Sequence, residues 1–366
     1  MRRLIIFVYS FNKTSQVFSH QIDVALALAE FYDQTVIFAD DVGVEERNTY
    51  ENSPHSNAKI VLIETLINQS TSPLHRFVAL AHIFRSLNSV SANSVFYFMT
   101  ETYAMVFGLY FRVRHVRQIL WYAHAHKSLR LFISSRFMDL VCSSTEGSMP
   151  IKSQKVRLIG QMVDPRLFPF APKEILKDVT LIHIGRFDKS KSLHKIMQAT
   201  ESLIARNPKL QLHVIGSPSN EIAENYRKEV IREFANCISE NKIRIDDALP
   251  RDKLHQHLQK SDIFIHAFQG SLDKTLIEAT MSGLPVATIN LEYLSEFGCW
   301  SNWAAYLSVQ SDKFLEMEID AILLLNFRAL KKELERRRDL ALSKHSLSIW
   351  LGHMSEVLRS TPGSPL

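Results

Sequence analysis

Residues 180–199 read TLIHIGRFDKSKSLHKIMQA, and residues 263–286 read IFIHAFQGSLDKTLIEATMSGLPV. Each stretch begins with a short apolar run, passes through a turn that contains glycine, and continues with apolar residues at helical spacing. A strand that leads through a turn into a helix is the repeating unit of a parallel sheet covered by helices. The two stretches therefore predict that the second half of the chain is a doubly wound α/β domain.

The same alternation runs along almost the whole chain. In the first half, the candidate strands are residues 4–9, 35–39, 59–63, 94–98, 118–122, 140–143 and 156–159, and the candidate helices are 20–31, 74–87 and 101–112. In the second half, the candidate strands are 179–184, 210–215, 242–245, 262–267 and 285–289, and the candidate helices are 191–206, 223–238, 251–259 and 273–282, with one long helix or two over 323–359. Apolar strands that alternate with helices predict parallel sheets buried on both faces.

The chain has 366 residues, which is long for one hydrophobic core and favours two domains. Asp164-Pro165 and the prolines at 169 and 172 interrupt the alternation and predict a linker. Two successive doubly wound domains would bind ligands at the carboxyl ends of their strands and in the cleft between the domains.

The composition is that of an ordinary globular protein, with 46% hydrophobic and 22% charged residues. No apolar stretch approaches the roughly 18 to 20 residues that a membrane-spanning helix requires. The apolar run after Met1-Arg2-Arg3 is short and lacks a small-residue cleavage site, so we expect a buried first strand rather than a signal peptide. The three cysteines (Cys142, Cys237, Cys299) form no CxxC pair, which fits a reducing cytoplasm.

The net charge of +5 is unevenly distributed. No acidic residue occurs between Glu101 and Asp139, whereas this stretch contains Arg112, Arg114, Arg117, Lys127, Arg130 and Arg136. Such a stretch could contact anionic lipid headgroups or a phosphorylated substrate, or it could be a solvated basic face without a partner. The aromatic residues at 96–98 lie in an apolar run typical of a core, so we expect no nucleic acid partner.

Basic residues follow the strand at 180–184. Gly185 would let the backbone approach a ligand closely, and Arg186 and Lys191 would project beside a helix N-terminus, where a diphosphate is favoured. Taken alone, this pattern is also what ordinary surface charges would give.

The stretch after the strand at 263–267 strengthens the prediction. Gly270 and Ser271 predict a tight turn, and Ser271 or Asp273 could cap the following helix. Backbone amides near Thr275 and Leu276 would then face a phosphate. Glu278, one turn further, could accept hydrogen bonds from both hydroxyls of a ribose, or it could be a salt-bridged residue on a helix face. The residues predicted to bind a nucleotide diphosphate are Gly185, Arg186, Lys191, Gly270, Ser271, Lys274, Thr275, Leu276 and Glu278.

The segments HIGRFDKSKSLHKIMQA (183–199) and HAFQGSLDKTLIEATMSGLPV (266–286) resemble the donor-binding motifs of glycosyltransferases of the family 4, or group 1, type. The resemblance implies the GT-B fold, in which two Rossmann-like domains face a cleft. It also implies that Arg186 and Lys191 bind the donor diphosphate and that Glu278 binds the nucleotide ribose.

The resemblance extends over most of the chain. The segment ILWYAHAHKSLRL (119–131) is similar to the family's strand that ends in a histidine near the transferred sugar, which would be His124, with His126 as a second candidate. The segment VRLIGQMVDPRLFPF (156–170) resembles the crossing between domains. The implied domains are an acceptor domain at 1–168, completed by a returning helix at about 346–360, and a donor domain at 169–345.

The sequence departs from the family pattern at three places. The acidic residue that many members carry eight positions before the ribose-binding glutamate is Gly270 here. The glycine after the lysine is Ser192, and the glycine-rich first loop is replaced by SFNKTSQVFS (10–19), which we expect to face the cleft.

The expected reaction is sugar transfer from a nucleotide sugar to a glycan or lipid-linked acceptor in bacterial surface polysaccharide synthesis. The resemblance implies retention of anomeric configuration, with His124, Arg186 and Lys191 as the catalytic group. The sequence has no DxD-like metal-ligand cluster, so we expect neither a metal nor another cofactor. The alternatives are a nucleotide-sugar epimerase of the same fold, a non-catalytic nucleotide-sugar-binding relative, and a basic scaffold on a membrane or nucleic acid. The expected location is the cytoplasm, with peripheral contact to the inner face of the membrane as an option.

Overall fold

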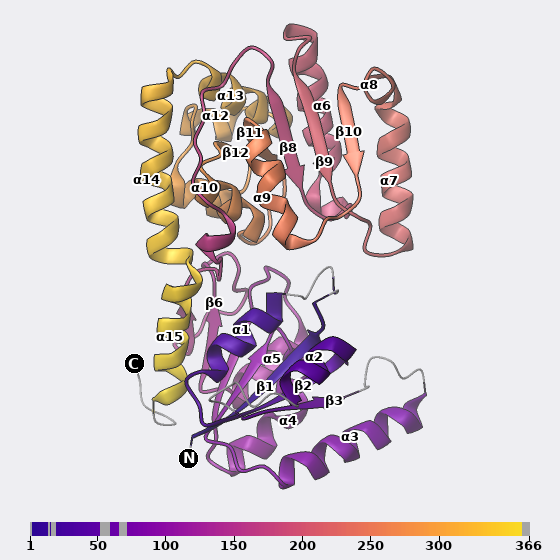
Figure 1. Ribbon diagram of the computed structural model, residues 1–366, viewed down its shortest axis with the longest axis vertical. Helices are drawn as coiled ribbons and strands as arrows, with labels where there is room; N and C mark the ends of the chain where they lie inside the picture. Colours follow the sequence, from indigo (N-terminus) through magenta and orange to yellow (C-terminus); the bar gives the residue numbers. More distant parts are fainter. Residues whose placement is uncertain (1, 14, 16–19, 52–58, 66–71, 361–366) are drawn as a thin grey trace. The chain divides into compact units, whose positions relative to one another are not determined.

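The computed structural model describes residues 2–13, 15, 20–51, 59–65 and 72–360, and its chain divides into two units. The N-terminal unit comprises residues 1–162 and 350–366, and the C-terminal unit comprises residues 163–349. Each unit is built on one parallel sheet with helices on both of its faces (Figure 1). The expected fold class, two doubly wound α/β domains, is confirmed.

The sheet of the N-terminal unit has seven strands in the order β3-β2-β1-β4-β5-β6-β7. Its strands are β1 (Arg3–Phe11), β2 (Gln34–Val42), β3 (Lys59–Glu64), β4 (Ser94–Phe98), β5 (Arg117–Trp121), β6 (Leu140–Ser143) and β7 (Val156–Leu158). Its helices are α1 (His20–Ala29), α2 (Val44–Glu51), α3 (Pro73–Asn88), α4 (Glu101–Val113) and α5 (Leu129–Phe137), followed much later by α15 (Leu347–Arg359).

The central strands of this unit are buried along their whole length, which explains their continuous apolar sequence. On one face, the ring of Phe7 stacks on Phe38 and Tyr97, with centroids 4.9 and 5.2 Å apart, and the helices α3 and α4 cover these rings. On the other face, Trp350 of α15 is fully buried against the rings of Phe98 and Trp121. Residues from the end of the sequence thus complete the core of the N-terminal unit.

The sheet of the C-terminal unit has five strands in the order β10-β9-β8-β11-β12. Its strands are β8 (Thr180–Ile184), β9 (Gln211–Ile215), β10 (Ile243–Asp246), β11 (Ile263–His266) and β12 (Val286–Thr288). Its helices are α6 (Leu193–Arg206), α7 (Glu221–Glu233), α8 (Ala235–Ser239), α9 (Arg251–Lys260), α10 (Lys274–Ser282), α11 (Leu291–Phe297), α12 (Trp303–Ser308), α13 (Ser311–Leu323) and α14 (Phe327–His345). One core packs α6 and α13 on the sheet, and a second core packs α10 and α14 on the opposite face.

Several helix boundaries shift by one or two residues from the sequence-based expectation, and three differences have structural consequences. The helix expected from residue 191 begins at Leu193, because Ser192 adopts a left-handed backbone (φ 51°). The helix expected over 223–238 is divided at Phe234 into α7 and α8. The segment expected to be one long helix or two over 323–359 contains the end of α13, then α14 and α15.

The break between α14 and α15 has a clear backbone cause. Ser346 is extended (φ −69°, ψ 148°) and forms an isolated bridge with Val163. The N–H of Val163 donates to the carbonyl of His345 at 3.0 Å, and the N–H of Leu347 donates to the carbonyl of Val163 at 2.8 Å. These bonds replace the helical bonds that a continuous helix would make there. Across the described ranges, none of the helices combines the length and hydropathy that crossing a bilayer demands.

Candidate active site

The order of the C-terminal sheet marks where a ligand is expected. β8 lies between β9 and β11. The chain continues from β8 to β9 and β10 on one side, and then crosses to β11 and β12 on the other side. The carboxyl ends of β8 and β11 therefore flank the topological switch point. The backbone is tightly packed there. The N–H of Gly185 donates to the carbonyl of Ile215 at 3.0 Å, and a Cβ on Gly216 would lie 1.8 Å from the carbonyl oxygen of Gly185. Only a glycine fits at 216 beside this turn.

Arg186 follows this turn and projects into solvent. Its side chain is half exposed, and its Nε lies 3.3 Å from Oδ2 of Asp188. An exposed ion pair of this kind is weak, because water screens it and both side chains lose conformational freedom. Arg186 can therefore exchange Asp188 for a phosphate at little cost.

Lys191 is held much more firmly than Arg186. It ends a short 3-10 turn (Lys189–Lys191), and its side chain is about nine-tenths buried. Its Nζ lies 2.5 Å from Oδ2 of Asp273 and 4.0 Å from the centroid of the Phe268 ring. The ammonium thus sits between a carboxylate and an aromatic face, both of which favour a cation.

Asp273 has a different role from the helix cap that the sequence suggested for it. It occupies the N-cap position of α10, but its side chain makes no capping hydrogen bond. Its Oδ2 instead faces Lys191 and, at 3.3 Å, Nε2 of His266. A buried ammonium forms a stronger hydrogen bond with a carboxylate than the backbone N–H of a helix end does, which explains why Asp273 pairs with Lys191 instead of capping α10.

The pKa values in this cluster are shifted by burial and by mutual charge. Burial by itself raises the pKa of Asp273, but Lys191 and His266 outweigh it, so that this pKa lies well below the usual range. Burial lowers the pKa of His266, although Asp273 opposes the shift. Burial and the neighbouring His266 lower the pKa of His183 to about 3. At neutral pH, the cluster therefore contains an ionised Asp273 beside two neutral imidazoles.

The loop between β11 and α10 is fixed by a side chain that sequence reasoning did not single out. The buried amide of Asn290 donates to the carbonyls of Phe268 at 2.8 Å and Ser271 at 3.2 Å. A Cβ on Gly270 would lie 2.2 Å from the Phe268 ring. Phe268 is thus packed against the backbone of Gly270, and the carboxylate that pairs with Lys191 comes from Asp273.

The first turn of α10 contains Lys274, Thr275 and Leu276. The Oγ1 of Thr275 is buried and, among the described residues, has no hydrogen-bond partner. The amide of Leu276 was expected to be exposed, but its N–H donates to the carbonyl of Asp273 at 3.2 Å and its side chain is fully buried. Thr275 thus has hydrogen-bonding capacity left for a ligand.

Glu278 lies one turn further along α10 and is buried. Its carboxylate forms an ion pair with Arg251, the first residue of α9. The alternative that the sequence left open, a salt-bridged glutamate on a helix face, therefore describes this structure. The pair joins the start of α9, which follows β10, to the second turn of α10, which follows the β11 loop.

The remaining candidate, His124, belongs to the N-terminal unit. It is exposed three residues after the end of β5, and its ring makes an edge contact with Tyr122 at 5.7 Å between centroids. At the same edge of that sheet, Met99 has a left-handed backbone (φ 60°) and its Sδ accepts the N–H of Ala123 at 3.3 Å. Of the loop at 10–19, residues 14 and 16–19 lie outside the described residues. Ser10 and Phe11 extend β1, and Ser10 Oγ donates to Asp41 Oδ2 at 3.0 Å.

In the C-terminal unit, Gly185, Arg186 and Lys191 follow β8, and residues 270–278 follow the adjacent strand β11. Lys191 contacts Asp273 of that second segment, whereas Arg186 pairs with Asp188. Sequence reasoning missed the partners Arg251, His266 and Asn290. Asn290 follows β12 at the same carboxyl edge, and this position after a strand was the signal available for it.

Comparisons with known proteins agree with this geometry. Residues 167–299 match the family described as glycosyl transferases group 1. Comparison with curated protein sequences finds no match. A structure of Anabaena HepE in complex with UDP and glucose is similar over 98% of this chain and 100% of that chain, with a TM-score of 0.72 and 12% identity.

Two further solved structures show the same similarity over nearly whole chains. Sucrose-phosphate synthase from Thermosynechococcus elongatus matches with a TM-score of 0.72 and 13% identity, over 98% of both chains. Trehalose-6-phosphate synthase OtsA matches with a TM-score of 0.68 and 13% identity, over 98% of this chain and 100% of that one. At these identities, the likeness establishes the GT-B fold, while the family match adds the group 1 assignment. The chain accordingly has the GT-B fold, and residues 167–299 of its C-terminal unit match the group 1 glycosyl transferases.

Proposed function

We propose that this enzyme transfers a sugar from a nucleoside-diphosphate sugar to a glycan or lipid-linked acceptor, with retention of anomeric configuration. The observation that carries the proposal is the buried ammonium of Lys191 at the switch point, with Arg186 on one side and the first turn of α10 on the other. A diphosphate placed there would meet both cations and the hydroxyl of Thr275. The ribose hydroxyls would reach Glu278.

The chemistry follows from where charge develops. As the bond between the anomeric carbon and the diphosphate oxygen breaks, negative charge grows on that oxygen, and Arg186 and Lys191 stabilise it more strongly than in the ground state. The acceptor hydroxyl attacks the same face of the sugar and gives its proton to the departing diphosphate. Under this proposal, His124 orients the sugar or the acceptor, and the two cations take over the charge stabilisation that a divalent metal provides in other transferases.

Donor binding would require two exchanges of partners. Lys191 would share or leave Asp273 for a phosphate oxygen, and Glu278 would divide its oxygens between Arg251 and the ribose. Both carboxylates keep a cation in the free site, so neither cation nor carboxylate is buried without compensation before the donor arrives. In the free site, each of these charged side chains therefore has an oppositely charged partner, and the donor would bind by replacing one partner in each pair.

A direct test measures UDP and GDP affinity and transfer activity for Lys191→Ala and Glu278→Ala. Loss of one hydrogen-bonded charge should weaken nucleotide binding by at least about tenfold. Lys189→Ala is the matched control, because Lys189 lies in the same turn but is exposed, and it should leave affinity unchanged. Unchanged affinity in both site variants would remove the assignment. Nucleotide binding without any turnover in the unaltered protein would instead assign a non-catalytic nucleotide-sugar-binding role.

The metal independence that we propose has its own test. Activity should persist in EDTA, and activity that collapses there and returns with magnesium or manganese would refute this part of the proposal.

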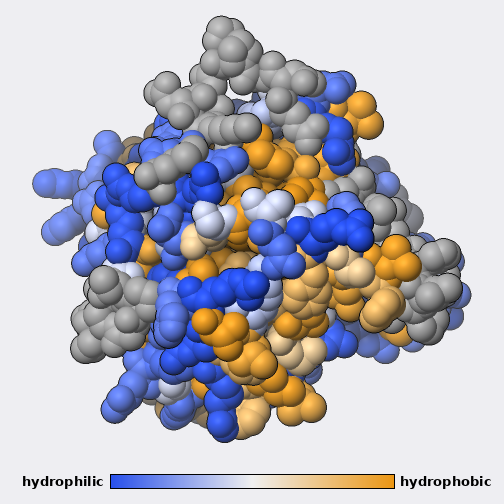
Figure 2. Space-filling model, turned by 90° about the horizontal axis from the view of Figure 1, so that it is seen from below, coloured by the Kyte–Doolittle hydropathy of each residue, from blue (hydrophilic) through white to orange (hydrophobic). Residues whose placement is uncertain are grey.

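We also propose that the N-terminal unit contacts the cytoplasmic face of a membrane, where a lipid-linked acceptor for surface polysaccharide would reside. The neighbouring helices α3, α4 and α5 expose apolar side chains, and basic residues lie among them. The exposed apolar residues are Phe77, Val78, Leu109, Val113, Leu129 and Phe132. Figure 2, which views the molecule from below, shows apolar side chains gathered between hydrophilic ones.

Arg112 and Arg114, at the end of α4, add positive charge beside this apolar face. Exposed apolar residues next to arginines are typical of interfacial contact with anionic lipid. Leu109→Glu and Val113→Glu should reduce flotation with phosphatidylglycerol vesicles, whereas Leu176→Glu, at an exposed site in the other unit, should not. Equal flotation of all variants would contradict the membrane contact.

A further inference from the structure

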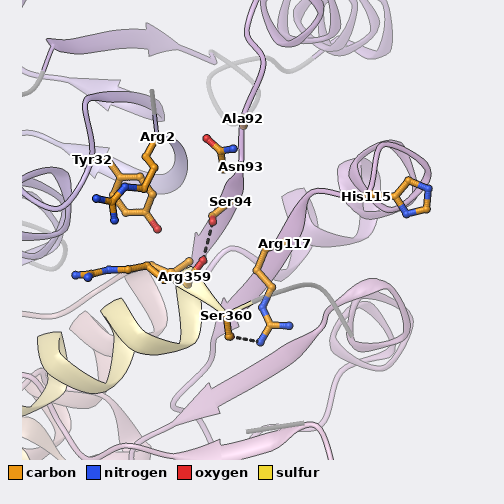
Figure 3. A pocket seen from close by; sticks show the side chains of 10 residues that line it. Arg2, Tyr32, Ala92, Asn93, Ser94, His115, Arg117, Arg359 and Ser360 are labelled. Carbon is orange, nitrogen blue, oxygen red and sulfur yellow. Dashed lines mark hydrogen bonds between the residues drawn. The ribbon is translucent and has the colours of Figure 1, made fainter. Parts of the chain in front are cut away.

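One group of polar residues outside the proposed donor contacts borders a cavity of about 410 Å³ at the amino edge of the N-terminal sheet (Figure 3). There, Nη2 of Arg117 donates to the hydroxyl of Ser360 at 2.9 Å, and Ser94 donates to the carbonyl of Leu358 at 2.8 Å. Figure 3 shows the guanidinium of Arg117 turned toward Ser360 and away from Tyr32. These bonds are explained by the docking of α15 on the sheet.

Another group lies behind Lys191 in the C-terminal unit and is not explained by docking. His266 ends β11, Thr288 ends β12, and Asn290 follows two residues later; all three are fully buried. Nε2 of His266 lies 3.3 Å from Oδ2 of Asp273, the oxygen that also faces Lys191. Nδ1 of His266 lies 3.2 Å from Oγ1 of Thr288. The proposed donor contacts do not include these three residues, so their alignment behind Asp273 calls for another role.

The hydrogen bonds determine which nitrogen of His266 carries the proton. In a neutral imidazole one nitrogen donates and the other accepts, and the ionised Asp273 can only accept. Nε2 is therefore the protonated nitrogen, and Nδ1 accepts from the hydroxyl of Thr288. The oxygen of Thr288 accepts the N–H of Asn290 at 3.1 Å, which leaves its own proton free for Nδ1. The donors thus run in one direction, from Asn290 through Thr288 and His266 to Asp273.

This series of bonds is fixed to the loop between β11 and α10. Asn290 also holds the carbonyls of Phe268 at 2.8 Å and Ser271 at 3.2 Å. The ring of Phe268 makes an edge contact with the ring of His266, with centroids 6.3 Å apart, and its face lies 4.0 Å from Nζ of Lys191. Because His266 is held by Thr288 and by Phe268, its N–H points at Asp273 independently of where Lys191 turns.

We propose that His266 is a positioning residue of the donor site, which holds the carboxylate of Asp273 in place when Lys191 turns toward the donor diphosphate. This inference rests on the function proposed above, in which Lys191 exchanges part of its contact with Asp273 for a phosphate oxygen. A buried carboxylate that loses its ammonium partner is costly, and the N–H of His266 offsets part of that cost. Thr288 acts one step further back, because it keeps the proton of His266 on the nitrogen that faces Asp273.

His266 should therefore matter to donor affinity only while residue 273 is charged. Without an N–H from position 266, Asp273 would hold Lys191 more strongly, and the donor would bind about tenfold more weakly. In Asp273→Asn there is no charge to compensate, so the same change at position 266 should have little effect. Coupling of this kind between two positions distinguishes a role exerted through Asp273 from a general loosening of the core.

The test measures UDP and GDP affinity by calorimetric titration of the full-length protein. His266→Phe should bind about tenfold more weakly, whereas His266→Gln, whose amide can place an N–H near the position of Nε2, should stay within about threefold of the unaltered protein. In the Asp273→Asn background, His266→Phe should change the affinity by less than about twofold. Thr288→Val should weaken binding and Thr288→Ser should restore it. Thr200→Val, which removes an equally buried hydroxyl that bonds within α6, should leave affinity unchanged.

A spectroscopic measurement on the unaltered protein does not depend on how any variant folds. Long-range ¹H–¹⁵N correlation spectra report which ring nitrogen is protonated, and the signal of His266 is the one that His266→Gln lacks. The proton is expected on Nε2, and a proton on Nδ1 would overturn the proposal, because Nε2 could then not donate to Asp273.

The affinity measurements can also refute this role by themselves. No loss in His266→Phe, or an equal loss with and without Asp273→Asn, would overturn it while leaving the proposed function intact, provided that Lys191→Ala weakens nucleotide binding. Unchanged affinity in Lys191→Ala would contradict the proposed function instead, because the ammonium would then not contact the donor.

Discussion

The carboxylate that neutralises Lys191 should limit how tightly this enzyme holds its donor. Asp273→Asn removes one negative charge but keeps an oxygen that can accept the hydrogen bond from Nζ, which lies 2.5 Å from Oδ2 in the free enzyme. A phosphate oxygen bound to the same ammonium would lie roughly 5 Å from Asp273, where two unit charges repel by about 3 kcal/mol at an effective dielectric constant of 20.

The net gain should be smaller than this repulsion. The side chain of Asp273 is 17% exposed, so solvent screens part of the charge. Half of the repulsion, about 1.5 kcal/mol, corresponds to a slightly more than tenfold change in affinity. Calorimetric titration with UDP and GDP should therefore show about tenfold tighter binding to Asp273→Asn. The matched control is Asp178→Asn, because Asp178 forms an exposed pair with Lys209 and should have no effect. Weaker binding to Asp273→Asn would refute the reasoning, because it would mean that the carboxylate serves the donor rather than competing with it.

Four further substitutions test the account of the fold and the loop, each by denaturant unfolding. Asn290→Ala should cost about 2–3 kcal/mol, because the amide holds the β11–α10 loop and its oxygen caps α11, and a loss under 0.5 kcal/mol would contradict this role. Trp350→Ala should cost about 3–5 kcal/mol by opening a cavity in the N-terminal unit, and an unchanged midpoint would show that α15 is dispensable there. Ser192→Gly should raise the free energy of unfolding by roughly 1 kcal/mol, since its left-handed backbone suits glycine, and a destabilised variant would count against that explanation. Burial raises the pKa of Glu296, but the hydrogen bond with His345 and the charge of Lys344 outweigh burial and lower it below its ordinary value. Glu296→Gln should therefore cost about 1–2 kcal/mol at pH 7, and this cost should disappear as pH falls through the lowered pKa of Glu296. A cost independent of pH would contradict the ion pair.

The architecture could be predicted from sequence because each buried parallel strand is a short apolar run that can be recognised from its own residues. The runs that form β1, β4 and β8 are apolar on both faces, and the segments between strands have apolar residues at helical spacing. The secondary structure of each segment can therefore be predicted from that segment alone. The polar helix α2 (VEERNTYE) lacks an apolar stripe, so sequence reasoning did not predict it. The short α12 and the longer α13 were missed as well.

The residues that surround the candidate site were harder to find, because their partners are distant in sequence. Arg251 meets Glu278 across 27 positions, and Lys191 meets Asp273 across 82. A turn pattern identifies which residues follow a strand, but it does not tell which carboxylate a buried ammonium will select. The donor-binding roles of Lys191 and Glu278 stay predictions that the variants above test. The roles of Arg186 and His124 stay predictions as well.

The return of α15 to the first unit has a consequence for how the chain is made. Ser94 donates to the carbonyl of Leu358, 264 positions later, and Arg117 reaches Val357 across 240 positions. During synthesis on a ribosome, the half that is translated first must wait for the last helix to emerge, whereas residues 163–349 already hold every strand of their own sheet. The later-made unit can thus mature before the earlier one, and a nascent chain stalled shortly before Trp350 should expose its leading half to protease while its trailing half resists digestion.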